Sequence, residues 1–501
     1  MIEGKNYRAY RLTAWAWLLV CLLLLVLVLF FPHTSYKAKN VFSSPFLLLP
    51  FGLVFFGLLY LLLKGTAIRK GLPLILGLVF LTFQIYCVKN YYFMTGWDSS
   101  NLLYAGILAP FGLEDEFLRD YFSYYPNNIL LAFFYMKIFT VVSLHEKAWT
   151  SALETIIFIQ CLLSFGTGLA TFKVIEKLTG QRSTALWGYF AFLLLIGLSP
   201  WVSIAYSDSA SLLFPILILW MYVSEPKNLF SKGLKWFGIG AVGFFGYHLK
   251  PTVIIPVIAI ICAELYELFS HHDYTKSFKK ALFLLLGILC AGVFIGQAVS
   301  AFPYEVDPEK RIGLPHFFAM GLNEDSMGVW AGDDVAYSKS FETVKERDAA
   351  DWALAKERIE SMKLPGLLRQ WMRKLLTCFN DGTFAWTHEG NFFAEIFEND
   401  SKTAEITRSF YYSNGKNYQI FLNAEQAIWL SLLLLSLGAF FSHGKAVAVI
   451  EITLLGLILY LLLFEVRARY VYIFAPLIIV LAACSIQSIS NPGFLKAPDR
   501  R

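Results

Sequence analysis

The chain has 501 residues, of which 57% are hydrophobic, 17% aromatic and only 16% charged. No soluble core needs so much apolar sequence, and this composition is typical of a polytopic membrane protein. The net charge of +5 is too small to indicate a nucleic-acid partner. The seven cysteines have neither the spacing of metal ligands nor the pattern of a disulfide framework.

Apolar runs recur along the chain at lengths close to those that cross a bilayer. The first follows three basic residues but has no small-residue cleavage site after it, so we expect a retained span and not a signal peptide. We expect an all-α polytopic fold with about twelve transmembrane helices by the length rule. These are residues 14–31, 45–63, 72–88, 152–172, 184–202, 209–223, 234–248, 253–268, 281–300, 427–441, 446–464 and 471–486.

Basic residues gather in the loops that follow every second expected span, and the positive-inside rule places such loops in the cytosol. The same rule places the segment after 72–88 outside. The apolar run 127–142 lies between an outside segment and a span that begins outside, so its crossing would invert every later loop. We therefore expect it to dip into the outer leaflet or to lie along it. The cytosolic groups include Lys173, Lys177 and Arg182; Lys227, Lys232 and Lys235; and Lys276, Lys279 and Lys280.

A change of composition divides the chain into three parts. Polar and charged residues replace the unbroken Leu and Phe in 301–425, for which we expect an extracellular mixed domain or long loop. Before it comes a transmembrane module, 1–300, whose first outer loop is 89–151. After it come the C-terminal transmembrane helices and a cytosolic tail, 426–501.

Three segments of the polar part have patterns of their own. Apolar side chains lie on one face of 364–379 and arginines off it, which predicts a helix on the membrane surface. The stretches 321–334 and 381–391 combine aromatic residues with glycine and short polar residues. This composition suits carbohydrate stacking, but ordinary loop packing has it as well.

Ionisable residues that the topology places at the outer surface form the candidate site. Asp98 follows the third span in Met-Thr-Gly-Trp-Asp-Ser-Ser-Asn, where by itself it reads equally well as a solvated turn aspartate. Asp208 and Lys250 lie in the next two outer turns. Arg467 and Arg469 lie beside Glu465 in a later one. Cations on this side oppose the charge bias and point to an anion, although snorkelling or pairing with a carboxylate explains each of them singly.

Several short motifs together resemble the GT-C glycosyltransferases. They are the Asp98 loop, Tyr-Tyr-Pro-Asn-Asn before the non-crossing helix, Tyr-Ser-Asp-Ser-Ala-Ser, Leu-Lys-Pro-Thr and Glu-Val-Arg-Ala-Arg-Tyr. The last three resemble family-39-like membrane proteins of Gram-positive bacteria in particular. The chain departs from the usual layout in two extra leading spans, in Asp98-Ser99 where Asp-Glu is common, and in Tyr125-Pro126-Asn127 where Lys-Pro-Pro is frequent.

The resemblance implies an inverting transfer of a sugar from a polyprenyl-phosphate donor to a hydroxyl-bearing acceptor of the cell envelope: a polysaccharide, a teichoic acid or a lipid. The reaction would take place at the outer face of the plasma membrane. Asp98 would be the general base, and Lys250, Arg467 and Arg469 would neutralise the phosphate leaving group. Some relatives hold a divalent ion at such aspartates, so a metal cofactor stays open. The expected substrate-binding residues are Asp208, Tyr125, Asn127 and Trp97.

Two other classes of function fit parts of the same pattern. A transporter or flippase for a lipid-linked glycan would also need outer basic groups, but transporters tend to have related halves and charges at mid-membrane. An assembly scaffold for cell-wall enzymes is a third, non-catalytic interpretation. One cavity that is enclosed by the outer ends of the spans and contains both Asp98 and Lys250 would favour the enzyme.

Overall fold

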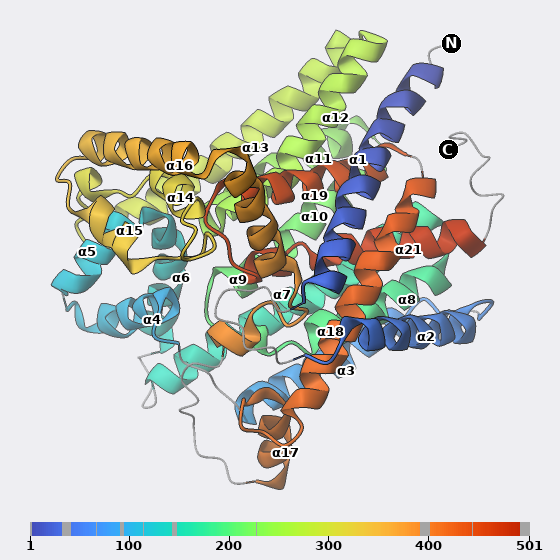
Figure 1. Ribbon diagram of the computed structural model, residues 1–501, viewed down its shortest axis with the longest axis horizontal. Coiled ribbons are helices and arrows are strands. Elements are labelled where there is room, and N and C mark those ends of the chain that lie inside the picture. The colour runs from blue at the N-terminus through green and yellow to red at the C-terminus, as the bar shows by residue number, and fades with distance from the viewer. Residues whose placement is uncertain are drawn as a thin grey trace.

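Helices form all the regular structure that is described. The computed structural model describes residues 3–32, 42–66, 68–90, 95–113, 115–142, 148–226, 228–390, 401–442 and 444–490. Within these ranges there is no β-strand (Figure 1). The expected all-α class is therefore confirmed, whereas the expected mixed character of residues 301–425 is wrong for the described part of that segment.

Eight helical segments of the described chain are long and apolar enough to cross a bilayer. Their hydropathy comes from nearly unbroken Leu, Phe, Ile and Val, which cost nothing to place among lipid chains. They lie in α1 (Glu3–Phe30), α2 (Pro45–Leu63), α3 (Leu72–Asn90), α7 (Ala148–Thr179), α12 (Ile255–His271), α13 (Tyr274–Ser300), α18 (Tyr418–Ser436) and α19 (Lys445–Leu463).

The other four expected spans are shorter or more polar than the length rule assumed. The apolar helix α21 packs against α7, α8 and α18, and its side chains from Ala475 to Ser488 are buried inside the protein. With 16 residues it is shorter than the roughly 20 residues that a crossing helix needs. The four are α8 (Arg182–Phe192), α10 (Leu213–Val223), α11 (Leu229–Leu249) and α21 (Ala475–Ser490).

The segment around Asp98 forms a small helical layer beside the bundle. It contains α4 (Asp98–Leu108), α5 (Glu116–Tyr124) and α6 (Ile129–Val142). The helix α6 has 14 residues and packs on α4 and α7. Its length of about 21 Å is less than the thickness of the hydrocarbon core. This is the run for which we expected no crossing.

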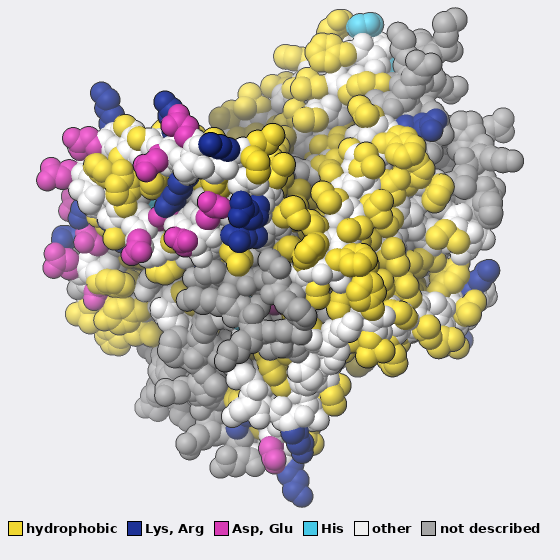
Figure 2. All heavy atoms as spheres, viewed as in Figure 1, with side chains coloured by type: hydrophobic (Ala, Val, Ile, Leu, Met, Phe, Trp, Pro, Cys, Tyr) yellow, Lys and Arg dark blue, Asp and Glu magenta, His cyan; other side chains and the backbone are white. Residues whose placement is uncertain are grey.

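The polar segment folds as a helical module that is tied to the bundle. It comprises α14 (Leu314–Gly321), α15 (Gly332–Lys339) and α16 (Val344–Phe379), whereas α17 (Lys402–Tyr411) lies apart from these helices and packs on α3 and α18 (Figure 1). Charged side chains gather over α14, α15 and α16, while hydrophobic ones cover much of the neighbouring bundle surface (Figure 2). The backbone N–H of Glu465 donates to Phe317 O at 2.9 Å, and that of Val466 to Gly328 O at 2.9 Å. These bonds fix the strand-like stretch that leads to the two arginines of the candidate site.

The helix α16 is two helices joined at a bend. A capping box of Thr343 and Glu346 starts it, and Lys363 adopts a left-handed φ of 53° before Pro365. The expected amphipathic helix follows the bend and exposes Leu364 and Leu368. Its last two turns are buried in the bundle, so only its first part is free to face a membrane surface.

A buried polar triad holds the module together. The Nδ1 atom of His316 lies 2.6 Å from Ser338 Oγ, and Ser338 donates to Asp351 Oδ1 at 2.7 Å. Because the serine proton points to the aspartate and all three side chains are buried, the arrangement is structural and unlike a hydrolase triad. Burial lowers the pKa of His316 from 6.5 to about 4.

This histidine predicts an acid-sensitive module. The unfolded chain takes up the proton near pH 6.5 and the folded chain only near pH 4, so folding is favoured above this window and loses up to about 3 kcal/mol as the pH falls through it. We expect proteolysis of the module to accelerate between pH 6.5 and 4. The variant His316→Gln has no proton to gain, and an equal acid response in it would contradict the assignment.

Labelling of single cysteines tests the expected orientation. Asp333 and Lys279 are both exposed, and the positive-inside rule places them on opposite sides. A cysteine at Asp333 should react with an impermeant reagent added to intact cells, and one at Lys279 only after permeabilisation. The reverse pattern would place Asp98 on the cytosolic side.

Candidate functional site

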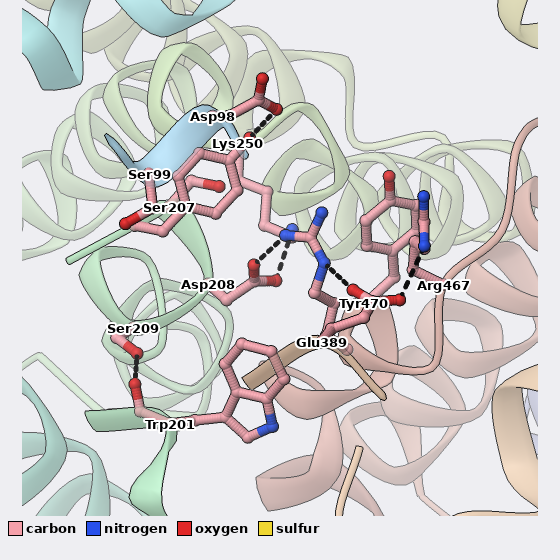
Figure 3. A network of polar contacts seen from close by, with 12 residues as sticks. Asp98, Ser99, Trp201, Ser207, Asp208, Ser209, Lys250, Glu389, Arg467 and Tyr470 are labelled. Atoms are coloured by element: carbon pink, nitrogen blue, oxygen red, sulfur yellow. Dashed lines mark hydrogen bonds and ion pairs between the residues drawn. The ribbon is translucent and has the colours of Figure 1, made fainter. Parts of the chain in front are cut away.

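Residues that are far apart in the sequence meet beside the N-terminus of α4. Asp98 is the first residue of that helix, and Tyr206 precedes the short helix α9 (Ser207–Ala210), which carries Asp208. Lys250 lies between α11 and the 3₁₀ turn Pro251–Ile254, and Arg469 starts α20 (Arg469–Tyr472). Helix ends and turns thus supply the site (Figure 3).

Asp98 is half-buried and held by a tyrosine. The hydroxyl group of Tyr206 donates to Asp98 Oδ2 at 2.9 Å. Burial, followed by the nearby charge of Asp98, raises the pKa of Tyr121, whose hydroxyl accepts from Asn128 Nδ2 at 2.6 Å. Burial, followed by the charge of Asp98, raises the pKa of Tyr206 well above its usual value. The tyrosine therefore stays protonated and donates, and the helix N-terminus adds favourable dipoles to the carboxylate.

Six ionisable side chains form one alternating chain of ion pairs. Asp208 accepts from Lys250 Nζ and from Arg469 Nη1, each at 2.7 Å. Arg469 Nε donates to Glu389 Oε2 at 2.7 Å. The series then continues through two longer pairs, which are Arg467 Nη1 to Glu389 Oε1 at 2.9 Å and Arg467 Nε to Glu465 Oε1 at 3.3 Å.

Burial makes this chain of ion pairs expensive to disturb. Asp208 is 1% exposed, Lys250 6% and Arg469 8%. Burial lowers the pKa of Lys250, and the carboxylate of Asp208 opposes that shift. Removing one partner from a buried pair leaves an uncompensated charge and costs about 3 to 5 kcal/mol. The network thus fixes the position of each member against its neighbours.

Aromatic rings surround the cations. The Arg469 guanidinium carbon lies 4.7 Å from the Trp97 ring centroid and 5.2 Å from that of Tyr206. Lys250 Nζ lies 4.6 Å above the Tyr470 ring. Trp97 Nε1 donates to Glu389 O at 3.2 Å. Tyr206 therefore touches Asp98 with its hydroxyl and Arg469 with its ring, so one side chain separates the carboxylate from the cation.

Most residues that the sequence singled out come together here. Trp97, Asp98 and Asp208 share the site with Lys250, Arg467 and Arg469, as their common side of the membrane predicted. Asp98 and Lys250 are thus linked through Tyr206, Arg469 and Asp208. The cavity described below is lined by neither of them, so the shared cavity that would favour an enzyme is not found there.

The other two predicted substrate-binding residues, Tyr125 and Asn127, lie around the turn before α6. Tyr125 packs on Tyr121 with ring centroids 5.4 Å apart and is half-buried. Asn127 is exposed and donates to Asn128 Oδ1 at 3.3 Å. The neighbouring Asn128 is the amide that reaches the site, through Tyr121. Adjacent residues at the start of a helix point in different directions, so only one of Asn127 and Asn128 faces the site. The sequence did not show which of the two it is.

Sequence reasoning missed two partners. Glu389 bridges both arginines although it lies in the stretch 381–391, which we considered for carbohydrate stacking. Residues 381–386 of that stretch are packed, since Trp386 is buried and Asp381 accepts from Thr383 N at 2.7 Å and from Ala385 N at 3.0 Å. Tyr206 gave no signal beyond its place two residues before Asp208.

The aspartates do not form a ready metal site. Within the described ranges, no group of three or more His, Cys, Asp or Glu side chains is placed to hold a metal ion. Both oxygens of Asp208 already accept from cations. A divalent ion at Asp208 would therefore have to displace Lys250 or Arg469.

A cavity of about 400 Å³ lies between α3 and α7, toward the end of α3 that leads to Asp98. Its wall is mostly apolar, and neither Asp98 nor Lys250 lines it. The polar groups are at the end of α3 and the beginning of α7. The lining residues are Ile85, Val88, Lys89, Ser151, Glu154, Thr155, Ile157, Phe158 and Cys161.

The fold and the apolar surface define an integral, multi-pass membrane protein. The chain belongs to a family of conserved hypothetical integral membrane proteins, whose family model matches residues 62–490. That match contains the whole candidate site. No curated protein matches the chain, and no solved structure matches it.

Proposed function

We propose that the protein is an inverting membrane glycosyltransferase of GT-C type. It moves a sugar from a polyprenyl-phosphate donor to a hydroxyl-bearing acceptor of the cell envelope, at the outer face of the plasma membrane. The observation that carries the proposal is that Asp98 and Arg469 contact the same side chain, Tyr206, one at its hydroxyl and the other at its ring. A half-buried carboxylate and a buried cation stand one side chain apart, which suits a base and a phosphate group at the two ends of one sugar.

The reaction needs only these two groups at the reacting centre. The acceptor oxygen attacks the anomeric carbon as Asp98 takes the acceptor proton, and the bond from the anomeric carbon to the phosphate oxygen breaks. The polyprenyl phosphate leaves with the electron pair and stays in the membrane. Tyr206 orients the Asp98 carboxylate through its hydrogen bond, which is what proximity catalysis requires of a base.

The ion pairs suggest a separate role for each of the three cations. Lys250, Arg467 and Arg469 face Asp208, Glu389 and Glu465, so the six charges cancel. Within the described residues, Arg469 Nη2 has no hydrogen-bond partner, while Nε and Nη1 are engaged. We assign phosphate recognition to this remaining edge of Arg469. Lys250 and Arg467 act as positioning residues that hold the carboxylates in place.

The apolar cavity supports a lipid-linked donor. Its polar end and its apolar wall match a molecule with a phosphate head and a hydrocarbon tail. It lies beside α3, whose end leads to Asp98, so a tail held between α3 and α7 has its head toward that side of the protein. A divalent ion, as in some GT-C enzymes, would have to bind Asp98 together with substrate oxygens, since Asp208 is occupied.

Envelope composition in the native bacterium tests the proposal. Deletion of the gene should remove one glycan signal from the wall polysaccharides or the lipoteichoic acid, and the wild-type gene should restore it. A gene that encodes Asp98→Asn should insert equally and fail to restore it. Restoration by this variant, or an unchanged glycan profile in the deletion strain, would remove the support for a transferase.

A further inference from the structure

A second polar cluster lies at the other end of the bundle. α10 begins near Asp208, and α11 ends at Lys250, so the end of α10 and the start of α11 lie away from the Asp98 site. There α12, α13 and α19 contribute Glu264, Lys280 and Lys445. This cluster is separate from the ion-pair chain described above.

Glu264 is the centre of the second cluster. Its Oε1 atom accepts from Lys445 Nζ at 2.7 Å and from the Tyr222 hydroxyl at 3.2 Å, and Oε2 accepts from Lys280 Nζ. The side chain of Glu264 is 15% exposed, that of Lys280 22% and that of Lys445 28%. The two ammonium groups are thus partly sheltered and still reachable.

A third ammonium group belongs to the same cluster. Lys235 Nζ donates to Ser224 O at 3.0 Å and to Tyr222 O, at the end of α10. The Trp236 ring lies 5.3 Å from Lys280 Nζ and 5.9 Å from Lys235 Nζ. Lys235, Lys280 and Lys445 therefore converge on one carboxylate and one aromatic wall.

Positive charge is in excess at this place. Lys280 and Lys445 share Glu264, and Lys235 donates to backbone carbonyls. Glu267 accepts from the Tyr10 hydroxyl and pairs with His271, and Glu225 pairs with Lys177 at 2.9 Å. Like charges that are partly removed from water repel one another strongly. A bound anion would relieve that repulsion, and basic pockets between membrane helices are known to take lipid phosphates.

We propose that Lys235, Lys280 and Lys445 form a binding site for a phosphate group, carried by the headgroup of an anionic phospholipid or by a soluble phosphate. Large apolar side chains on the same helices are exposed close to the lysines, among them Leu234, Phe269 and Phe278 at 57%, 72% and 68%. They offer a surface for acyl chains beside the headgroup. The site is independent of the proposed transferase activity.

Native mass spectrometry of the detergent-purified protein tests the site with phosphatidylglycerol, phosphatidylcholine and inorganic phosphate as probes. Phosphatidylglycerol should be retained in preference to phosphatidylcholine. The double variant Lys280→Gln/Lys445→Gln should bind it on the order of a hundredfold more weakly, because it loses two charge-assisted contacts and each is worth about tenfold. The matched control is Lys276→Gln/Lys279→Gln, which removes the same charge from exposed positions of the same segment and should bind like the wild type.

A second variant keeps the test informative if the first folds poorly. Glu264→Gln removes the carboxylate that Lys280 and Lys445 contact and should strengthen binding, whereas a purely structural ion-pair cluster gives no such gain. If millimolar inorganic phosphate displaces the lipid, the site is one for soluble phosphate. If the lipid stays bound in the presence of phosphate, the site is one for a lipid headgroup. Equal retention of the two lipids together with no phosphate binding, or equal binding by the double variant and its control, would overturn the proposal.

Discussion

Replacement of Asp98 by asparagine is expected to lower the rate of sugar transfer by about a hundredfold to ten-thousandfold, which is the usual cost of losing a general base. The amide keeps the shape of the side chain and can still accept from the Tyr206 hydroxyl. It cannot take the acceptor proton. Donor binding and the elution profile in detergent should therefore stay close to those of the wild type.

Two further variants separate a base from a structural aspartate. Asp98→Glu should recover little activity, because an added methylene moves the carboxylate off the line of attack. Tyr206→Phe removes one hydrogen bond of about 1 kcal/mol and should lower the rate by roughly tenfold or less. Near-wild-type turnover by Asp98→Asn with donor bound would exclude Asp98 as the base.

Loss of Arg469 is expected to have the largest effect on stability. Arg469→Gln leaves the buried carboxylates of Asp208 and Glu389 each with one cation fewer, at a cost of about 3 to 5 kcal/mol. We expect a much shorter lifetime of the protein in detergent on heating, followed by size-exclusion chromatography. The exposed Arg369→Gln on α16 is the control and should change this lifetime little.

A double variant shows whether the loss comes from unpaired charge. Asp208→Asn combined with Arg469→Gln removes an ion pair as a unit, so part of the stability should return. Phosphate recognition should not return, because the free edge of Arg469 is still missing. If the losses of the two single variants simply add, the residues are not coupled, and the network does not act as a unit.

Sequence patterns predicted the membrane helices best where local signals were strong. The bounds of α2 are those that we expected, since Pro45 suits the first turn of a helix and Lys64 follows the last apolar residue. The same patterns could not predict which apolar helices are buried inside the protein. The run that forms α21 is as apolar as a lipid-facing span, but its side chains from Ala475 to Ser488 are buried against other helices, which hydropathy and length do not show.

The sequence predicted several of the charged residues of the candidate site, but it did not predict the side chains with which they pair. Asp98, Lys250 and Arg469 stood out because ionisable groups at the ends of apolar runs are unusual. Glu389 did not stand out, because a single glutamate among glycine and aromatic residues is ordinary loop composition. Its contacts arise from a packed turn that brings it back to the arginines, and only tertiary structure shows that.

Proteoliposomes with a doubly labelled donor test the central claim most directly. A synthetic polyprenyl-phosphate sugar carries one label on the sugar and another on the lipid, and the purified protein is supplied with an envelope extract as acceptor. Our account predicts that the labels separate, with the sugar on the acceptor and the polyprenyl phosphate left in the membrane, and that Asp98→Asn abolishes the separation. Movement of both labels together across the bilayer, with the donor intact, would contradict it and identify a transporter.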